Sequence, residues 1–391
     1  MFKDIKIGCS SSMTKYGARL DTAIVRLEKK AIWSGLFTSN KFKSAPVEIC
    51  LEKMNKNISE PKVLMVNAGN ANAATGKKGK KDSEKLIEEV SSLLNISKEN
   101  ILPFSTGVVG ELLDTKKLSQ AFKKCTEQLG ENSWKDFAKA IMTTDTCHKV
   151  VKKQFSLGAQ KINVIGVAKG VGMIEPNMAT TLSFIFTDLK LSKSQLKKLH
   201  KEICDQTLNA ISIDGDQSPS DSSIFATTCE KKNDIKKYYK KIKNNFLDVF
   251  KELSEKLVLD GEGATKLIKI KVSGLSSHEA SKKVALKVAN SPLVKTAAYG
   301  EDPNWGRIIT AAGNSGEREF EMKNLSLKIG GHPVLINGNL SPKYSETKGK
   351  KEFRKKIINI EIILGKSKKS ALVMTSDLSP EYISINSDYR S

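Results

Sequence analysis

The chain of 391 residues is long enough for two or three domains, and its 39% of apolar residues argues against disorder of the whole chain. Its 65 Lys and Arg against 43 Asp and Glu give a net charge of +22, which raises nucleic acid, an anionic membrane surface or an acidic small molecule as partners. Six cysteines without a C-x-x-C pair and four scattered histidines argue against a disulfide framework, a metal centre or a Ser-His-Asp hydrolase.

Strand-like runs and helical stretches alternate through the first half of the sequence. Runs rich in β-branched and other apolar residues predict strands at 22–27, 63–67, 162–167 and 182–186. Apolar residues at helical spacing predict helices at 82–94, after Asp114, at 134–142 and at 192–210. Asp82 or Ser83 is the expected N-terminal cap of the first of these helices.

The second half continues the alternation and becomes richer in short strands and Gly-rich turns. Apolar residues between Phe246 and Leu257 follow the spacing of an amphipathic helix. A further helix is predicted at 281–289, and strands at 325–329, 333–336 and 357–364. We expect a larger catalytic domain at 1–275 and a smaller C-terminal domain at 276–391. The predicted fold class is α/β, or α+β layered, with sheets sandwiched by helices.

The basic charge consists almost entirely of lysine, since only six residues are arginine. Nucleic-acid readers rely on arginine for bidentate contacts, so a diffuse lysine excess favours a compositional bias over a nucleic-acid footprint. The densest run, Lys231 to Lys243, is interpreted as the solvated face of a helix start. The sequence shows no secretory signal and no apolar run of membrane-spanning length, so we expect a soluble, cytoplasmic protein.

One segment, residues 169–184, carries a pattern suited to a presented nucleophile. Glycines, Pro176 and a hydroxyl residue precede an apolar strand. A threonine hydroxyl needs an adjacent base, which in N-terminal-nucleophile enzymes is the threonine's own α-amine. That amine would appear if Thr180 Oγ attacked the Ala179 carbonyl and water hydrolysed the resulting ester. Taken alone, the segment favours an ordinary loop that ends in a threonine at a strand start.

The run 175–182, Glu-Pro-Asn-Met-Ala-Thr-Thr-Leu, resembles the self-cleavage site of the ornithine acetyltransferases, also called glutamate N-acetyltransferases, of arginine biosynthesis. Further blocks resemble this family in the same order, at 69–76, 105–111, 142–146, 260–266, 302–308 and 385–391. The resemblance covers essentially the full chain. It implies the layered fold shared by these enzymes and related N-terminal-nucleophile aminopeptidases.

The resemblance also implies a set of site residues. Thr180 would be the nucleophile, freed by cleavage between Ala179 and Thr180, and Thr106 and Gly107 would form the oxyanion hole. The implied substrate-binding residues are Thr143, Lys169, Thr180, Glu262, Asn386 and Ser391. We hypothesise that Lys169 binds a substrate carboxylate and that Glu262 binds the side-chain ammonium of ornithine.

The implied reaction is a ping-pong transfer of acetyl from N2-acetylornithine to glutamate in arginine biosynthesis. Acetyl-CoA as a second donor is left open, and no metal or cofactor is expected. The implied assembly is a heterotetramer of two cleaved pairs, without nucleic-acid or membrane partners. A related aminopeptidase or amidohydrolase is the alternative, and a basic nucleic-acid-binding protein is a distant third.

The sequence departs from the family pattern at several places. Glu175 stands where the family commonly has His, and Cys147-His148 replaces Phe-Pro. Residues 214–221 read Asp-Gly-Asp-Gln-Ser-Pro-Ser-Asp, which differs from the usual run at Gln217 to Ser220, and Ser391 replaces a frequent Thr. These differences put the local loop geometry and the substrate preference in question.

Overall fold

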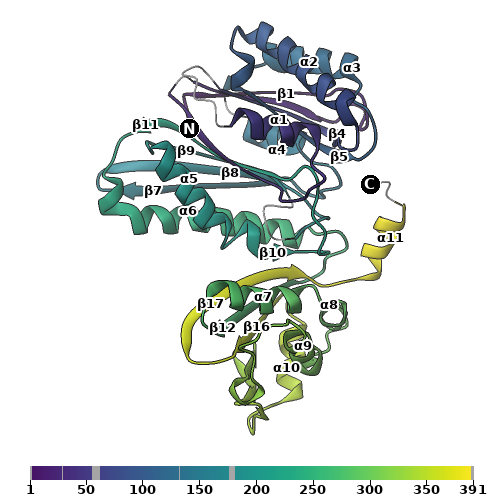
Figure 1. Cartoon of the computed structure of the whole chain (residues 1–391), viewed down its shortest axis with the longest axis vertical. Coiled ribbons are helices and arrows are strands. Elements are labelled where there is room, and N and C mark those ends of the chain that lie inside the picture. Colours follow the sequence, from purple (N-terminus) through teal and green to yellow (C-terminus); the bar gives the residue numbers. More distant parts are fainter. Residues whose placement is uncertain (1, 29, 55–61, 132, 176–180, 389–391) are drawn as a thin grey trace.

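The computed structural model describes residues 2–28, 30–54, 62–131, 133–175 and 181–388. Two stacked sheets with helices on their outer faces form the upper lobe in Figure 1, and a third sheet with its own helices forms the lower lobe. The prediction of a layered α/β fold is confirmed.

The first sheet has five strands and lies in the upper part of the upper lobe. In sheet order they are β5 (Ile101–Val108), β4 (Lys62–Asn70), β2 (Thr22–Leu27), β1 (Ile5–Ser10) and β6 (Gly130–Glu131). Its outer face packs on α2 (Gly76–Leu94) and α3 (Thr115–Glu127), and α1 (Ala45–Lys53) lies against β5. Strands β4 and β5 run parallel, and both are apolar on both faces because each face is covered.

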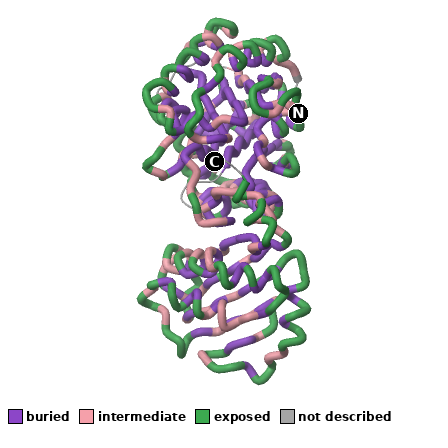
Figure 2. The backbone as a smooth tube through the Cα atoms, turned by 90° about the vertical axis from the view of Figure 1, so that its right-hand side faces the viewer, coloured by how far each residue is buried: buried purple, intermediate pink, exposed green. Residues whose placement is uncertain are grey.

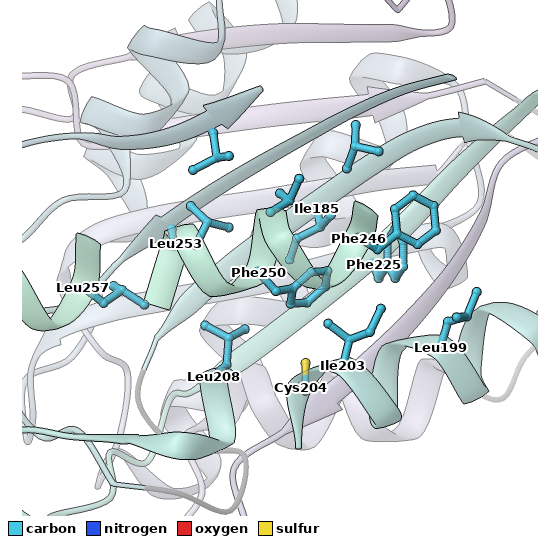
Figure 3. Close-up of a cluster of buried hydrophobic side chains, with 14 of the residues drawn as sticks. Ile185, Leu199, Ile203, Cys204, Leu208, Phe225, Phe246, Phe250, Leu253 and Leu257 are labelled. Atoms are coloured by element: carbon cyan, nitrogen blue, oxygen red, sulfur yellow. The ribbon is translucent and has the colours of Figure 1, made fainter. Parts of the chain in front are cut away.

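The second sheet also has five strands, most of which are antiparallel to their neighbours. In sheet order they are β3 (Ile32–Phe37), β11 (Ser222–Lys231), β9 (Leu182–Leu189), β8 (Gln160–Lys169) and β7 (Lys149–Leu157). Its outer face is covered by α5 (Lys193–Cys204) and by the long α6 (Ile235–Leu259). Buried apolar side chains fill the space between this sheet and the two helices, and Figure 3 shows Phe246, Phe250 and Leu253 of α6 among them. The predicted amphipathic helix is therefore confirmed.

The inner faces of these two sheets share one apolar core. It contains side chains from β1, β2, β4 and β5 on one side and from β8, β9 and β11 on the other. Phe104 of β5 and Phe184 of β9 meet across the layers edge to face, with ring centroids 5.1 Å apart. Helix α4 (Trp134–Ala140) contributes Trp134 and Phe137 to the same core. This packing fixes the two sheets relative to each other.

The third sheet has seven strands and forms the lower lobe with the helices of the C-terminal third. In sheet order its strands are β10 (Ile211–Ser212), β17 (Ser367–Ser376), β12 (Leu267–Gly274), β16 (Ile357–Ile363), β13 (Ser326–Ile329), β14 (His332–Ile336) and β15 (Asn339–Leu340). Its helices are α7 (His278–Ala289), α8 (Pro292–Tyr299), α9 (Trp305–Gly313) and α10 (Glu346–Phe353). The predicted boundary at Leu275 falls at the end of β12, so this sheet includes residues on both sides of it.

The chain leaves β17 and returns to the upper lobe as helix α11 (Pro380–Asp388). Figure 2 shows the buried segments concentrated inside the two lobes. None of the nine residues of α11 is fully buried. The helix therefore lies on the surface and joins the two lobes from outside.

Helix α2 begins earlier than the sequence predicts. It starts at Gly76 instead of at Asp82, and the expected cap residues Asp82 and Ser83 lie buried within it. Lys78 pairs with Asp82 at 2.6 Å one turn away, so this carboxylate has a partner inside the helix. Asp114, by contrast, accepts a hydrogen bond from the backbone N–H of Lys117 and caps α3, so the helix predicted after Asp114 is confirmed. Among the described residues, no helix has the combined length and apolarity of a membrane span.

Leu253 provides a test of the packing between α6 and the second sheet. Its side chain is fully buried, and Gly166 of β8 leaves room for it, since a Cβ there would lie 2.5 Å from a Leu253 methyl carbon. We expect Leu253→Ala to lower the free energy of unfolding by about 2–5 kcal/mol. Leu259→Ala, in the same helix but 44% exposed, is the matched control and should have little effect. Urea denaturation followed by circular dichroism measures both, and equal midpoints would contradict this packing.

Candidate active site

A cavity of about 430 Å³ lies where β5 and β8 end, where β9 begins and where α11 reaches the upper lobe. The structure brings six of the predicted site residues to its wall: Thr106, Gly107, Thr143, Lys169, Glu262 and Asn386. Thr181, directly after the predicted nucleophile, also lines it. Ala179, Thr180 and Ser391 lie outside the described residues, and the roles assigned to all these residues stay predictions.

Lys169, the last residue of β8, links two hydroxyl groups at the centre of the site. Its Nζ donates to Thr106 Oγ1 at 3.1 Å and to Thr143 Oγ1 at 2.8 Å. An ammonium group has only donors, so both hydroxyl oxygens accept these bonds and keep their own protons for other acceptors. The Thr106 hydroxyl is thus arranged to donate, as an oxyanion-binding group must.

The charge of Lys169 is balanced by the groups around it. The side chain is only 8% exposed, and this burial lowers the pKa of its ammonium group, while the nearby Asp145 carboxylate raises it. Burial prevails, so the pKa lies below that of a solvated lysine.

Gly107 is required by the close approach of β5 to β4. It has φ +132°, and a Cβ there would lie 2.2 Å from the carbonyl carbon of Gly69 on the neighbouring strand. Only glycine fits this combination of backbone conformation and contact. The tight pairing places the backbone of Gly107 at the cavity wall beside Thr106.

Glu262 contributes a carboxylate opposite the lysine and is held by two side chains. Thr144 donates its hydroxyl to Oε1 at 3.1 Å, and Asn386 of α11 donates its amide to Oε2 at 3.0 Å. A Cβ at Gly172 would lie 2.6 Å from Oε2, so glycine there leaves room for the carboxylate. The surface helix α11 thereby supplies part of the site.

Sequence reasoning gave no role to Asp214 or Tyr382, which lie at the same cavity. Asp214 accepts the backbone N–H groups of Met173, Ile174 and Asp216 at 2.7, 2.8 and 3.3 Å, and the Tyr382 hydroxyl donates to it at 3.4 Å. Burial raises the pKa of the Asp214 carboxyl. The run 214–221 could have pointed to Asp214, because it departs from the family pattern at Gln217 to Ser220 and these residues line the cavity. Tyr382 had no signal in the sequence.

The exposed Cys147 and the half-buried Glu175, the other departures, are not among the residues that line this cavity. Asn290 donates to Glu175 Oε1 at 3.2 Å, and burial raises the pKa of this carboxyl.

The cavity combines a cation, a carboxylate and donor hydroxyl groups in a small volume. It suits a small molecule that carries both a carboxylate and an ammonium group, with a carbonyl placed beside Thr106 and Gly107.

Comparison with known proteins identifies similar chains. A model of the ArgJ family matches residues 6–391. A protein named arginine biosynthesis bifunctional protein ArgJ, from Bradyrhizobium diazoefficiens, is 38% identical over 395 residues, which cover 99% of this chain and 95% of the relative. A protein of the same name from Methylococcus capsulatus is 35% identical over 390 residues, 99% of this chain and 95% of its own length. A solved structure under that name, from Bacillus halodurans, has 28% identity and a TM-score of 0.50, and covers 53% of this chain and 98% of its own.

Gly107→Ala tests the close approach of β5 and β4. The added methyl group would meet the Gly69 backbone, so we expect a loss of about 1–3 kcal/mol of unfolding free energy beyond that of the control. Gly110→Ala is the control, because Gly110 also has a positive φ, +88°, but a Cβ there meets nothing within 4 Å. Urea unfolding midpoints give the comparison. Equal losses in both variants would mean that the strand separation is not constrained at Gly107.

Proposed function

The chain belongs to the ArgJ family, and we propose that it transfers acetyl from N2-acetylornithine to glutamate through an acetyl-Thr180 intermediate. It is an acyltransferase of arginine biosynthesis. The proposal covers the donor, the acceptor, the covalent intermediate and the maturation by cleavage between Ala179 and Thr180.

The observation that carries this proposal is the position of Thr181. It lines the same cavity as Thr106, Gly107 and Lys169. Thr181 is also anchored, because its carbonyl accepts the backbone N–H of Ser222 at 2.9 Å. Thr181 directly follows Thr180 in the sequence, and the wall that Thr181 lines offers a donor hydroxyl group and a glycine backbone. This supports Thr180 as the group that takes the acetyl.

The proposed chemistry consists of one self-cleavage step and two acetyl-transfer steps. Thr180 Oγ first attacks the Ala179 carbonyl, and hydrolysis of the ester leaves Thr180 with a free α-amine. The amine then accepts the hydroxyl proton as Oγ attacks the acetyl carbonyl of the donor, and ornithine leaves with a proton on its α-nitrogen. Finally the α-amine of glutamate attacks the acetyl carbonyl, and the bond between this carbonyl and Thr180 Oγ breaks. The proton lost by the glutamate nitrogen passes through the Thr180 α-amine to Oγ, and N-acetylglutamate leaves. The Thr106 hydroxyl and the Gly107 N–H would stabilise the oxyanion in the two transfer steps.

The charges of the cavity support the choice of substrates. In our proposal Lys169 attracts the α-carboxylate that donor and acceptor share, and Glu262 binds the side-chain ammonium that only the ornithine compound carries. Thr144 and Asn386 hold the Glu262 carboxylate in place for that contact.

The lengths of the compared chains support maturation by cleavage. The solved Bacillus halodurans chain matches 53% of the present chain with nearly its whole length. Residues 180–391 make up a similar share. Acetyl-CoA as a second donor, the absence of a cofactor, the heterotetramer and the cytoplasmic location stay predictions.

Thr180→Ala tests the nucleophile. Without the hydroxyl we expect a single 43.0 kDa band on a denaturing gel and loss of acetyl transfer. Thr180→Ser is the matched control, since it keeps a hydroxyl and should still cleave and turn over. N-acetylglutamate is measured with N-acetylornithine and glutamate as substrates. Cleavage of Thr180→Ala would overturn the proposal, and acetate in place of N-acetylglutamate from the unmodified protein would indicate a hydrolase.

Glu262→Gln tests the division of charges. Loss of an ion-paired hydrogen bond should raise KM for N-acetylornithine by about ten- to a hundredfold, with a smaller effect on KM for glutamate. Glu255→Gln, which breaks an ion pair with Lys269 outside the cavity, is the control. Steady-state kinetics with each substrate varied give the result. An equal rise for both substrates would contradict the role of Glu262, and Lys169→Ala with unchanged substrate binding would contradict that of Lys169.

A further inference from the structure

Three charged side chains form a buried ion triad behind the cavity: Asp145, Lys149 and Asp260. They are 7%, 1% and 9% exposed, respectively. Lys149 Nζ bonds Asp145 Oδ1 at 2.6 Å and also pairs with Asp260 Oδ2. None of the three lines the cavity. Buried charges are costly to desolvate, so a triad of this kind is weak evidence for stability alone.

Asp145 holds the backbone of two cavity segments at once. Its Oδ2 accepts the N–H of Thr143 at 3.1 Å, and its Oδ1 accepts the N–H of Gly170 at 2.8 Å. Thr143 and Lys169, which precedes Gly170, both line the cavity, and a 2.8 Å hydrogen bond joins Lys169 Nζ to Thr143 Oγ1. One carboxylate therefore sets the spacing between the lysine and its hydroxyl partner.

The other end of the triad reaches the segment that carries the cavity carboxylate. Asp260 accepts both the N–H and the hydroxyl of Thr146, and it lies two residues before Glu262. The N–H of Glu262 donates to the carbonyl of Val171 at 2.8 Å. Through Lys149, the positions of Lys169 and Glu262 are thus coupled.

We propose that Asp145 is a positioning residue for the acyl transfer, which keeps Lys169 in place and charged while Lys149 joins it to the Glu262 segment. This inference rests on the proposed function for its catalytic consequence. Its physical content, the dependence of Lys169 on Asp145, stands without it.

The charged groups facing Lys169 decide the sign of the effect. Asp145, Asp221 and Glu262 raise the pKa of its ammonium group, whereas Lys149 lowers it. Asp145→Asn would remove the foremost of these anionic neighbours and leave two cations close together. The neutral amine is then favoured, so Lys169 should lose its proton at a lower pH than in the unmodified protein.

The experiment is competitive labelling of lysines with a trace acylating reagent across a pH series, read by mass spectrometry on the peptide that contains Lys169. Only the neutral amine reacts, so the midpoint of labelling reports its titration. We expect this midpoint to move to lower pH in Asp145→Asn. Asp188→Asn is the matched control. Asp188 is also buried and also binds a lysine and a backbone N–H, but it lies at the end of β9 away from the cavity.

A double variant keeps the test decisive if Asp145→Asn does not fold. Asp145→Asn with Lys149→Met removes one anion and one cation together. Because Lys149 lowers the pKa of Lys169, the loss of Lys149 offsets part of the pKa decrease caused by Asp145→Asn. The labelling midpoint of the double variant should therefore lie between those of the single variant and the unmodified protein. If only the double variant folds, its midpoint should lie below that of the unmodified protein. An unchanged midpoint in a folded variant, or an equal shift in Asp188→Asn, would overturn the proposal.

The kinetic readout separates this proposal from the proposed function. If the unmodified protein transfers acetyl, we expect kcat/KM to fall by about 100-fold in Asp145→Asn, because displaced catalytic groups lose their alignment. A fall of less than about twofold would contradict the positioning role. If the unmodified protein transfers no acetyl, the proposed function fails, and the labelling midpoint still decides whether Asp145 controls Lys169.

Discussion

The arrangement of the cavity depends on keeping one buried ammonium group satisfied. A buried charge is tolerated only where acceptors or opposite charges surround it. Lys169 meets this requirement with hydroxyl groups from β5 and from the loop after α4, and with the carboxylate of Asp145 nearby. The partners of this one cation therefore bring together segments that are far apart in the sequence. The same constraint makes the Thr106 hydroxyl an acceptor toward the lysine and leaves its proton available for another acceptor.

The four layers of the upper lobe supply the rigidity that such a site needs. The rings of Phe104 on β5 and Phe184 on β9 pack edge to face between the two sheets. Residues at one end of each of these strands line the cavity. The glycine contact between Gly107 and Gly69 fixes the spacing of β5 and β4 at the same end. Loops then need to place only the remaining side chains, among them Thr143 and Glu262.

The sequence predicted those parts of the fold that depend on local periodicity. The helix through Phe246 and Leu257 and the helix after Asp114 follow from the spacing of apolar residues, which operates within a few turns. The start of α2 was wrong, because Asp82 finds a lysine one turn earlier in the helix and does not act as a cap. Such competition between a cap and an internal ion pair is not visible in residue types alone.

The site shows the same division between local and long-range signals. Resemblance to family blocks placed Thr106, Lys169 and Glu262 in one site, and the structure gathers them around one cavity. Asp145 lies in the block 142–146 that resembles the family, but the sequence assigned it no role. Its bonds to Gly170 and Lys149 depend on how β7 and β8 pair and on the loops that precede and follow them, which residue types alone do not show. Tyr382 comes to the site only because the chain returns from the third sheet, which no local pattern records.

The exposure of α11 has a consequence for how the cavity opens. The helix buries none of its nine residues. Hydrogen bonds join Tyr382 to Asp214 and Asn386 to Glu262, and Ser379, directly before the helix, donates to the carbonyl of Gly263. Few apolar contacts must break for it to detach, so its backbone amides should exchange with solvent through local opening well below the free energy of global unfolding. A ligand that stabilises the Glu262 segment would slow this exchange. The amides of α11 should therefore become more protected from hydrogen exchange when the cavity is occupied.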